Sequence, residues 1–154
     1  MLSRQVELSR PTPDRPKIRP EGRRMIPIDS KSLQVLVVDD DEVSRELVTE
    51  LLKAAGYEVT IARDGSEALG MAAAKVFDLV LMDLDMPVMD GLAATRAIRQ
   101  LPGLARSVTI VILTGRSSDD DRRAALHAGA NGFVTKPFRI INIAPWLDAE
   151  LRRK

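Results

Sequence analysis

The sequence predicts an α/β fold, in which helices cover both faces of a doubly wound, five-stranded parallel sheet. Two observations support this fold class. From residue 33 onward, apolar runs alternate with helical patterns five times. The connections between the runs are long enough for one helix each, which is typical of parallel strands buried on both faces. A core of this kind needs about 120 residues, and the chain has 154.

Signals for helix starts and stops accompany the first two connections. Apolar residues within 43–55 recur at helical spacing on one face, and Gly56 can end that helix in the left-handed conformation. Residues 58–62 form a short strand after it. Ser66 can then cap a second helix that runs through Lys75.

The next two helices are marked in the same way. The Asp90-Gly91 pair opens a third helix, which ends near residue 100. Ser117 or Ser118 can cap a fourth helix, whose first turn carries three aspartates beside the positive end of the helix dipole. Gly129 follows as its stop signal.

The last unit consists of a strand at residues 131–135 and a helix that Asn142 can cap. With that cap, Pro145 falls in the first helical turn, where its missing N–H costs little. Five strand–helix units of these lengths imply a parallel sheet with helices on both faces. For this sheet we assume the flavodoxin-like strand order 2-1-3-4-5, with strand 2 at one edge.

Four of the five strands end at a residue that can take part in chemistry. Asp39 and Asp40 close the first strand, Asp83 the third and Thr114 the fourth, and Lys136 follows the fifth. In the predicted order these four strands are neighbours, and parallel strands present their carboxyl ends at the same edge of a sheet. The sequence therefore predicts one pocket that holds all five side chains.

The residue types in this pocket favour phosphoryl transfer. Three carboxylates at roughly 5 Å repel each other by about 3 kcal/mol per pair at an effective dielectric of about 20. Mg²⁺ prefers such oxygen ligands and also neutralises an incoming phosphoryl group. Asp83 can supply the nucleophilic carboxylate, Lys136 the positive charge and Thr114 a hydroxyl donor.

The motifs around these residues resemble those of response-regulator receiver domains. The resemblance extends from about residue 33 to residue 152 and rests on four segments, which are residues 37–41, 81–91, 113–115 and 132–138. The segment around Asp83 looks most like the receivers that are attached to hybrid histidine kinases. Because no output domain follows the last helix, a stand-alone receiver is expected.

The resemblance implies a function in a phosphorelay. Asp83 would accept a phosphoryl group from a phosphohistidine on a histidine kinase or a histidine phosphotransfer protein. Asp40, Asp83 and the backbone carbonyl of Asp85 would ligate Mg²⁺, with Asp39 acting largely through water. Such a protein is not an enzyme beyond its own phosphorylation and slow dephosphorylation.

The resemblance further implies a switch pair, Thr114 and Phe133, although Phe133 lacks the hydroxyl of the tyrosine often found there. The switch would change partner contacts on the face of helix 4, strand 5 and helix 5. A downstream protein target would read this face, and a phosphorylation-dependent homodimer is compatible with it. The bond between Lys136 and Pro137 is cis in the family and is expected to be cis here.

Two positions are expected to tune the lifetime of the phosphoryl group. Asp85 lies two residues after Asp83, and Arg116 lies two residues after Thr114. Family members vary at these two places. We expect an ion pair between the Asp85 and Arg116 side chains to hinder attacking water and to slow hydrolysis.

Two other functions fit parts of the pattern. Haloacid-dehalogenase-like phosphatases also use Asp-x-Asp after an apolar strand, as in Asp83-Leu84-Asp85. In those phosphatases the acidic pair follows the lysine, whereas Asp39 and Asp40 precede it here, and the chain has no room for their usual cap domain. A non-phosphorylated interaction module on the same fold is disfavoured because all five site residues are present.

Composition separates residues 1–31 from a receiver domain at residues 32–154. The first segment has five prolines and a charge of +4, from eight basic and four acidic residues, while the whole chain is +1. It is expected to be a disordered Pro- and Arg-rich tail, for which a solvated leader is favoured over a weak electrostatic contact with nucleic acid or an acidic protein.

The absence of cysteine excludes disulfides and thiolate metal sites. No apolar run approaches the ~20 residues of a membrane helix, and no signal-peptide core is present. A cytoplasmic protein without membrane contact is therefore expected.

Overall fold

The computed structural model describes residues 17–18, 24–25, 32–115, 118–137 and 139–153. The chain divides after residue 31 into two units, which are described separately. In the first unit, strands β1 (Lys17–Ile18) and β2 (Arg24–Met25) pair in antiparallel fashion. The rest of the predicted tail lies outside the described residues, so its disorder stays a prediction.

The second unit is built on a sheet of five parallel strands in the order β4-β3-β5-β6-β7. Numbered from the start of this unit, that is the order 2-1-3-4-5, so the predicted topology is confirmed. The strands are β3 (Gln34–Val38), β4 (Glu58–Ala62), β5 (Leu79–Asp83), β6 (Thr109–Thr114) and β7 (Gly132–Thr135).

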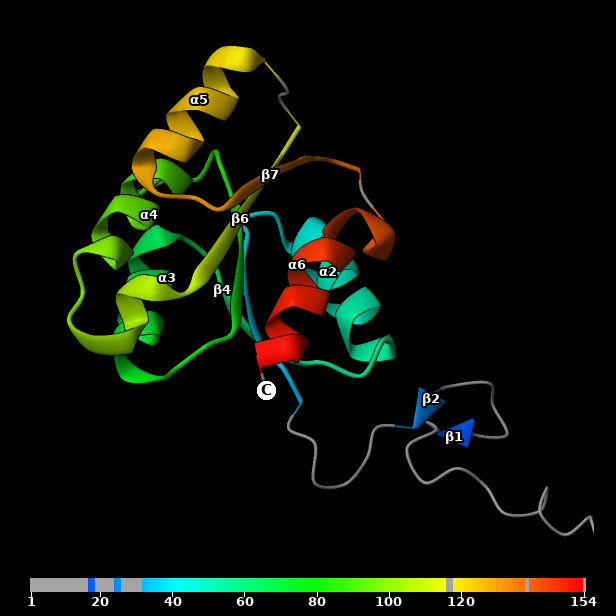
Figure 1. Ribbon diagram of the computed structural model, residues 1–154. Helices are drawn as coiled ribbons and strands as arrows, with labels where there is room; N and C mark the ends of the chain where they lie inside the picture. The colour runs from blue at the N-terminus through cyan, green and yellow to red at the C-terminus, as the bar shows by residue number, and fades with distance from the viewer. Residues whose placement is uncertain (1–16, 19–23, 26–31, 116–117, 138, 154) are drawn as a thin grey trace, which may run out of the picture. The chain divides into compact units, whose positions relative to one another are not determined.

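Helices cover both faces of this sheet, as Figure 1 shows. One face is covered by α2 (Glu42–Ala54) and α6 (Ile140–Arg153). The other face is covered by α3 (Gly65–Ala74), α4 (Gly91–Arg99) and α5 (Asp119–Ala128). A short 3-10 helix, η1 (Gly103–Ser107), precedes β6. Side chains of β3 alternate between the two resulting cores: Leu36 and Val38 pack in one, Val35 and Val37 in the other. No helix among the described residues has both the length and the apolar character to cross a bilayer.

The helix boundaries follow most of the predicted signals. Gly56 and Gly129 adopt positive φ angles of 98° and 109° after α2 and α5. Asp90 caps α4 through the N–H of Ala93, and Ser118 caps α5. Each signal acts within one turn of the residue that carries it, which is why the sequence alone was sufficient.

The predicted cap of α3 at Ser66 is wrong. Asp64 comes earlier, and its carboxylate accepts a 2.9 Å hydrogen bond from the N–H of Glu67, so the helix begins at Gly65. A Cβ on Gly65 would lie 2.5 Å from the carbonyl oxygen of Met89. Glycine therefore fits the first position because the neighbouring loop passes so close to it.

The start of α6 also differs from the prediction. The helix begins at Ile140, so Asn142 lies within its first turn and does not precede the helix as a cap. The Asn142 side chain instead accepts a hydrogen bond from the N–H of Arg139, just before the helix. Pro145 consequently lies inside the helix instead of in its first turn. Pro145 is exposed there, and it provides no N–H for the helix.

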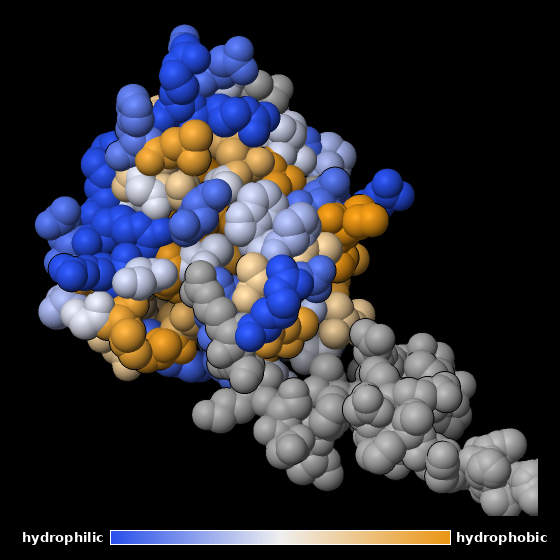
Figure 2. Space-filling view, viewed as in Figure 1, coloured by the Kyte–Doolittle hydropathy of each residue, from blue (hydrophilic) through white to orange (hydrophobic). Residues whose placement is uncertain are grey.

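The apolar face of α2 is wider than the surface that the helix buries. Val48 and Leu52 are buried against the sheet, while Val43 and Leu47 are 74% and 60% exposed. The buried surface of α2 instead includes the side chain of Arg45. Figure 2 shows apolar side chains reaching the surface at several places among hydrophilic ones.

One arginine ties together the edge of the sheet at which the strands begin. The guanidinium of Arg99, at the end of α4, donates hydrogen bonds to the carbonyl oxygens of Gly129, Arg106 and Val108. It also donates to the side-chain oxygen of Asn131 at 2.9 Å. The last turns of α4 and α5 and the starts of β6 and β7 are thus held by a single side chain.

The loop between β5 and α4 contains a strained residue. Val88 has a φ of 69° and is 86% exposed. The left-handed region costs an ordinary residue about 1–2 kcal/mol, and β-branched side chains are among the least suited to it. Val88 gains little from burial in return.

Replacing Val88 by Asn is expected to raise the free energy of unfolding by about 0.5–1 kcal/mol, because Asn tolerates the left-handed region better. Urea denaturation followed by circular dichroism measures the change. The matched control is Val76→Asn, at a 61% exposed valine without a positive φ. Equal shifts in the two variants would show that backbone strain at Val88 is not the cause.

Candidate functional site

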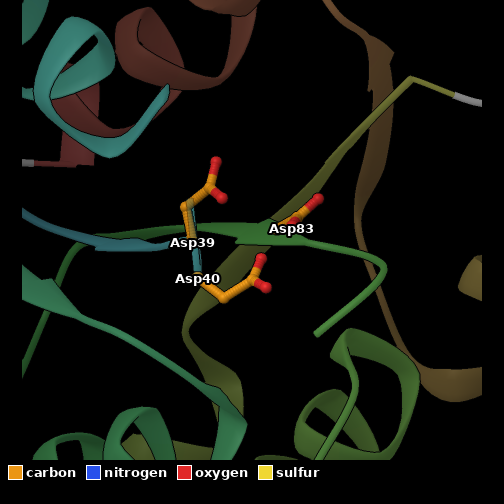
Figure 3. A group of neighbouring side chains, drawn as sticks. All are labelled: Asp39, Asp40 and Asp83. Atoms are coloured by element: carbon orange, nitrogen blue, oxygen red, sulfur yellow. The ribbon is translucent and has the colours of Figure 1, made fainter. Parts of the chain in front are cut away.

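The three carboxylates predicted to share a pocket do lie together. Asp39 and Asp40 follow β3, Asp83 ends β5, and one oxygen of each lies within 4.8 Å of the other two (Figure 3). Asp39 and Asp83 are buried, at 3% and 8% exposure, whereas Asp40 is exposed. Two of the three carboxylates are therefore removed from water, and the third faces the opening of the pocket.

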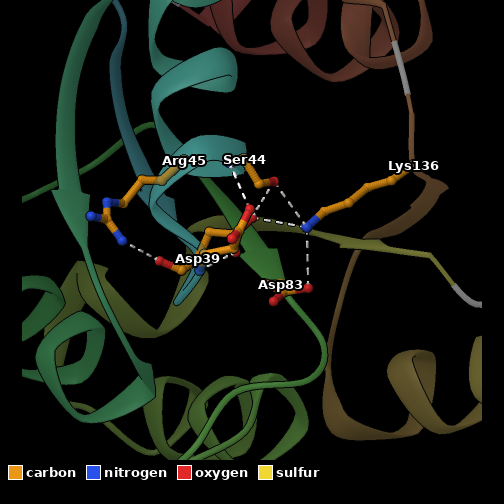
Figure 4. Close-up of polar contacts among 6 residues, drawn as sticks. Asp39, Ser44, Arg45, Asp83 and Lys136 are labelled. Carbon is orange, nitrogen blue, oxygen red and sulfur yellow. Dashed lines mark hydrogen bonds and ion pairs between the residues drawn. The ribbon is translucent and has the colours of Figure 1, made fainter.

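Lys136 reaches this cluster from the end of β7. Its Nζ donates to Asp39 Oδ2 at 2.8 Å and lies 3.4 Å from Asp83 Oδ1 (Figure 4). The Lys136–Pro137 peptide bond is cis, as predicted. The N–H of Lys136 also donates to the carbonyl of Thr114, which joins the ends of β6 and β7. The ammonium thus contacts both buried carboxylates, with the shorter distance to Asp39.

Two side chains of α2 belong to the site although the sequence did not single them out. Ser44 Oγ donates to Asp39 Oδ2 at 2.7 Å and accepts from Lys136 Nζ at 3.2 Å. Arg45 Nη1 donates to the backbone carbonyl of Asp39 at 2.8 Å. The only sequence signal for them is their place in the first turns of a helix that begins beside the acidic pair.

The two buried carboxylates have different pKa values because their surroundings differ. Burial raises the pKa of Asp83 to about 6, against the opposing charge of Lys136 and with a further increase from Asp39. Burial would also raise the pKa of Asp39, but hydrogen bonds from Lys136, Asp41 and Ser44 hold it below its usual value of 3.8. Asp83 is therefore mostly ionised at neutral pH but is the carboxylate that is easier to protonate.

Lys136 stays charged in this pocket. Burial alone would lower its pKa, but the hydrogen bond to Asp39 and the charge of Asp83 raise it above 10.5. A fixed positive charge beside two carboxylates suits a site that receives an anionic group.

The donor set fits Mg²⁺. Three carboxylate oxygens within 4.8 Å of one another, one group exposed and two buried, leave room for water and for an oxygen of an incoming group.

The side chain of Asp85, whose carbonyl is a predicted ligand, is exposed. Arg116 lies outside the described residues, so its pairing with Asp85 stays a prediction. Asp41 caps α2, and Asp90, which was expected to open the third helix, caps α4.

The loop after Asp83 packs closely against the backbone of this residue. A Cβ on Gly91 would lie 2.2 Å from the carbonyl oxygen of Asp83, and the N–H of Gly91 donates to the carbonyl of Leu84. The first turn of α4 therefore packs directly on the backbone of the site. Only glycine allows that approach.

The predicted switch residues are both buried. Thr114, at the end of β6, is 1% exposed, and Phe133 in β7 is 7% exposed. The guanidinium of Arg122 on α5 lies 4.8 Å from the centre of the Phe133 ring, within the range of a cation–π contact. The Phe133 ring thus lies between the interior of the sheet and a charged side chain of α5.

Comparison with known proteins agrees with this geometry. The family model of the response regulator receiver domain matches residues 35–147. The response regulator MprA of Mycobacterium tuberculosis is 41% identical over 122 residues, which are 79% of this chain and 52% of that protein. The transcriptional regulatory protein PrrA of Mycobacterium bovis is 39% identical over 123 residues, 80% of this chain and 52% of that protein. The chain spans about half the length of these curated relatives.

Solved structures show the same fold. The receiver domain of the sensor histidine kinase PA1611 from Pseudomonas aeruginosa PAO1, with a magnesium ion coordinated in its active site cleft, matches with a TM-score of 0.72 and 34% identity over 79% of this chain and 99% of that one. The chemotaxis protein CheY4 of Vibrio cholerae matches with a TM-score of 0.71 and 34% identity over 77% of this chain and 98% of that one. The acidic cluster, the lysine at the end of β7 and these matches together place the chain in the response regulator receiver domain family of two-component signalling.

Proposed function

We propose that this chain accepts a phosphoryl group from a protein phosphohistidine onto Asp83 and passes the signal on by changing its protein contacts. The observation that carries the proposal is the setting of Asp83: a buried carboxylate, 3.4 Å from Lys136 Nζ, with oxygens of Asp39 and Asp40 within 4.8 Å. Membership in the receiver family supports it over the phosphatase alternative.

The chemistry follows from these positions. An oxygen of Asp83 attacks the phosphorus, the new O–P bond forms, and the P–N bond of the donor breaks with its electron pair on the imidazole nitrogen. Mg²⁺ held by Asp39, Asp40, Asp83 and the carbonyl of Asp85 would supply charge neutralisation for the phosphoryl oxygens. The Lys136 ammonium balances the remaining negative charge.

The surface beside the pocket offers a place for the donor protein. Val43, Leu47 and Leu51 of α2 line a groove together with Lys136 and Pro137. Exposed apolar groups that border a reactive site are typical of protein contacts. A donor that docks on this groove would bring its phosphohistidine to the side of the pocket at which Lys136 lies.

The response is proposed to leave the site through α5, β7 and α6, the expected helix 4, strand 5 and helix 5 face. Thr114 would respond to the phosphoryl group, and Phe133, under Arg122, would repack with it. A downstream target or a second copy of the chain would then read the altered face. The lifetime of that state is proposed to depend on Asp85 and Arg116.

Replacing Leu47 by Glu tests how the phosphoryl group arrives. Transfer from phosphorylated histidine phosphotransfer domains should fall by about tenfold or more, the equivalent of 1.4 kcal/mol of lost docking energy. Uptake from phosphoramidate with Mg²⁺ should stay within about twofold, because the reacting groups are unchanged. Phosphorylated protein is measured by intact mass.

The matched control is Leu126→Glu, at a 52% exposed leucine on α5. Leu126→Glu should accept the phosphoryl group from the donor domains at the same rate as the unaltered chain. If the unaltered chain takes no phosphoryl group from any donor, the proposed function fails. If both Leu→Glu variants lose transfer equally, the α2 groove is not the docking surface.

A further inference from the structure

The ammonium of Lys136 has three protons and three acceptors around it. The acceptors are Asp39 Oδ2 at 2.8 Å, Ser44 Oγ at 3.2 Å and Asp83 Oδ1 at 3.4 Å. Two of them lie on the β3–α2 side of the pocket, and the third is the proposed phosphoryl acceptor (Figure 4). With two protons engaged on that side, the third is directed at Asp83.

The Ser44 hydroxyl connects two members of this arrangement. It donates to Asp39 Oδ2 at 2.7 Å and accepts from Lys136, so it stands between a carboxylate and an ammonium. A hydroxyl in such a chain is polarised from both ends, which strengthens both hydrogen bonds. Since Lys136 has a long flexible side chain, two anchors restrict its orientation far more than one ion pair does.

The hydroxyl has no evident role in the helix itself. At the start of α2 the backbone N–H of Ser44, and not its side chain, is bonded to the capping carboxylate of Asp41. Alanine has a higher helix propensity than serine, so removal of the hydroxyl should leave α2 intact. The hydroxyl is only partly buried, so its loss opens no large cavity.

We propose that Ser44 is a positioning residue for phosphoryl transfer: with Asp39 it anchors the Lys136 ammonium so that its remaining proton meets the group arriving at Asp83. This inference rests on the proposed function, because it assumes that Asp83 is the acceptor. Ser44 does not touch the phosphoryl group. Its effect passes entirely through Lys136.

Ser44→Ala is the direct test. Uptake from phosphoramidate with saturating Mg²⁺ should slow by about fivefold, the size expected for the loss of one hydrogen bond of ordinary strength. Ser44→Thr keeps the hydroxyl and should restore most of the rate. Glu46→Ala, an exposed change on the same helix, should have no effect. A rate in Ser44→Ala equal to or above that of the unaltered chain overturns the proposal.

A double-mutant cycle separates positioning from a general structural effect. Lys136→Met alone should slow phosphoryl uptake. Adding Ser44→Ala to this variant should lower the rate no further, because Ser44 acts only through the lysine. Additive losses would overturn the inference. The failure of the proposed function looks different: the unaltered chain would then show no uptake at all.

A measurement without metal or donor completes the test. In protein labelled with ¹⁵N-lysine, the Nζ protons of Lys136 should exchange slowly with water because all three are bonded. In Ser44→Ala this exchange should become several times faster, while other lysines are unchanged. Equal exchange in both proteins would contradict the anchoring of Lys136 by Ser44.

Discussion

Asp83→Asn is expected to lose phosphoryl uptake completely. The unaltered chain should add a single phosphoryl group from phosphoramidate or acetyl phosphate in the presence of Mg²⁺. An uncharged amide oxygen is a poor nucleophile, and no other described carboxylate lies against Lys136 in the same way: Asp39 is bound by Ser44, Asp41 and Lys136, and Asp40 faces solvent. Intact mass after reaction, followed by peptide mapping, measures the result.

The control for this experiment lies in the same loop. Asp90→Asn removes a carboxylate but keeps the cap of α4, because asparagine caps helices as well as aspartate does. Its uptake should match that of the unaltered chain. Uptake by Asp83→Asn at the unaltered rate would assign the phosphoryl group to another residue.

The second large effect concerns stability without metal. The folded pKa of Asp83 is about 6, above its unfolded value of 3.8. Between these values the folded state binds a proton that the unfolded state does not, so lowering the pH through 6 favours folding. The resulting gain in the free energy of unfolding amounts to about 3 kcal/mol once the pH reaches the unfolded pKa. Metal-free protein should therefore become more stable between pH 7 and pH 4.5.

Asp39 contributes with the opposite sign but outside this range. Its folded pKa lies below 3.8, so the stability it contributes is lost only as the pH falls below that value. The raised pKa of Lys136 has no effect here, because the lysine is charged in both states throughout the range. The change in the free energy of unfolding between pH 7 and pH 4.5 should thus report mainly on the protonation of Asp83.

Urea denaturation in EDTA at several pH values measures this slope. Asp83→Asn should flatten it and should raise the stability at pH 7, as Asp40→Asn should to a smaller extent. Mg²⁺ should stabilise the unaltered chain at pH 7 by binding only to the folded site, and should stabilise both variants less. An identical slope in Asp83→Asn and the unaltered chain would show that Asp83 is not the titrating group.

The sheet order and the main site residues were predictable because both depend on local signals. Apolar runs mark the strands, and the residue that ends each run lies at the carboxyl edge of the sheet. Asp39 and Asp83 follow from this rule alone, and Thr114 ends β6 at the same edge, while its part in the site stays a prediction. Lys136 lies just past β7, and the structure places it with them.

Other features depend on how helices pack, which the pattern does not contain. Ser44 and Arg45 reach Asp39 because of the direction in which α2 crosses the end of β3. Two exposed residues, Val43 and Leu47, continue the apolar pattern of the buried Val48, so the pattern could not show which part of it is covered. The wrong cap at Ser66 had a local origin instead, because Asp64 is a capping residue two positions earlier in the chain.

The hydrogen bonds of Arg99 give the two ends of the sheet different mechanical roles. Its guanidinium pins the entry points of β6 and β7 and the last turn of α5, while Thr114, Lys136 and the first turn of α5 lie at the opposite end of these elements. In the proposed response, the end held by Arg99 would move less than the opposite end. If the proposed phosphorylation displaces α5, a partner bound near Ser118 would therefore contact an altered surface, whereas one bound near Gly129 would contact an almost unchanged one.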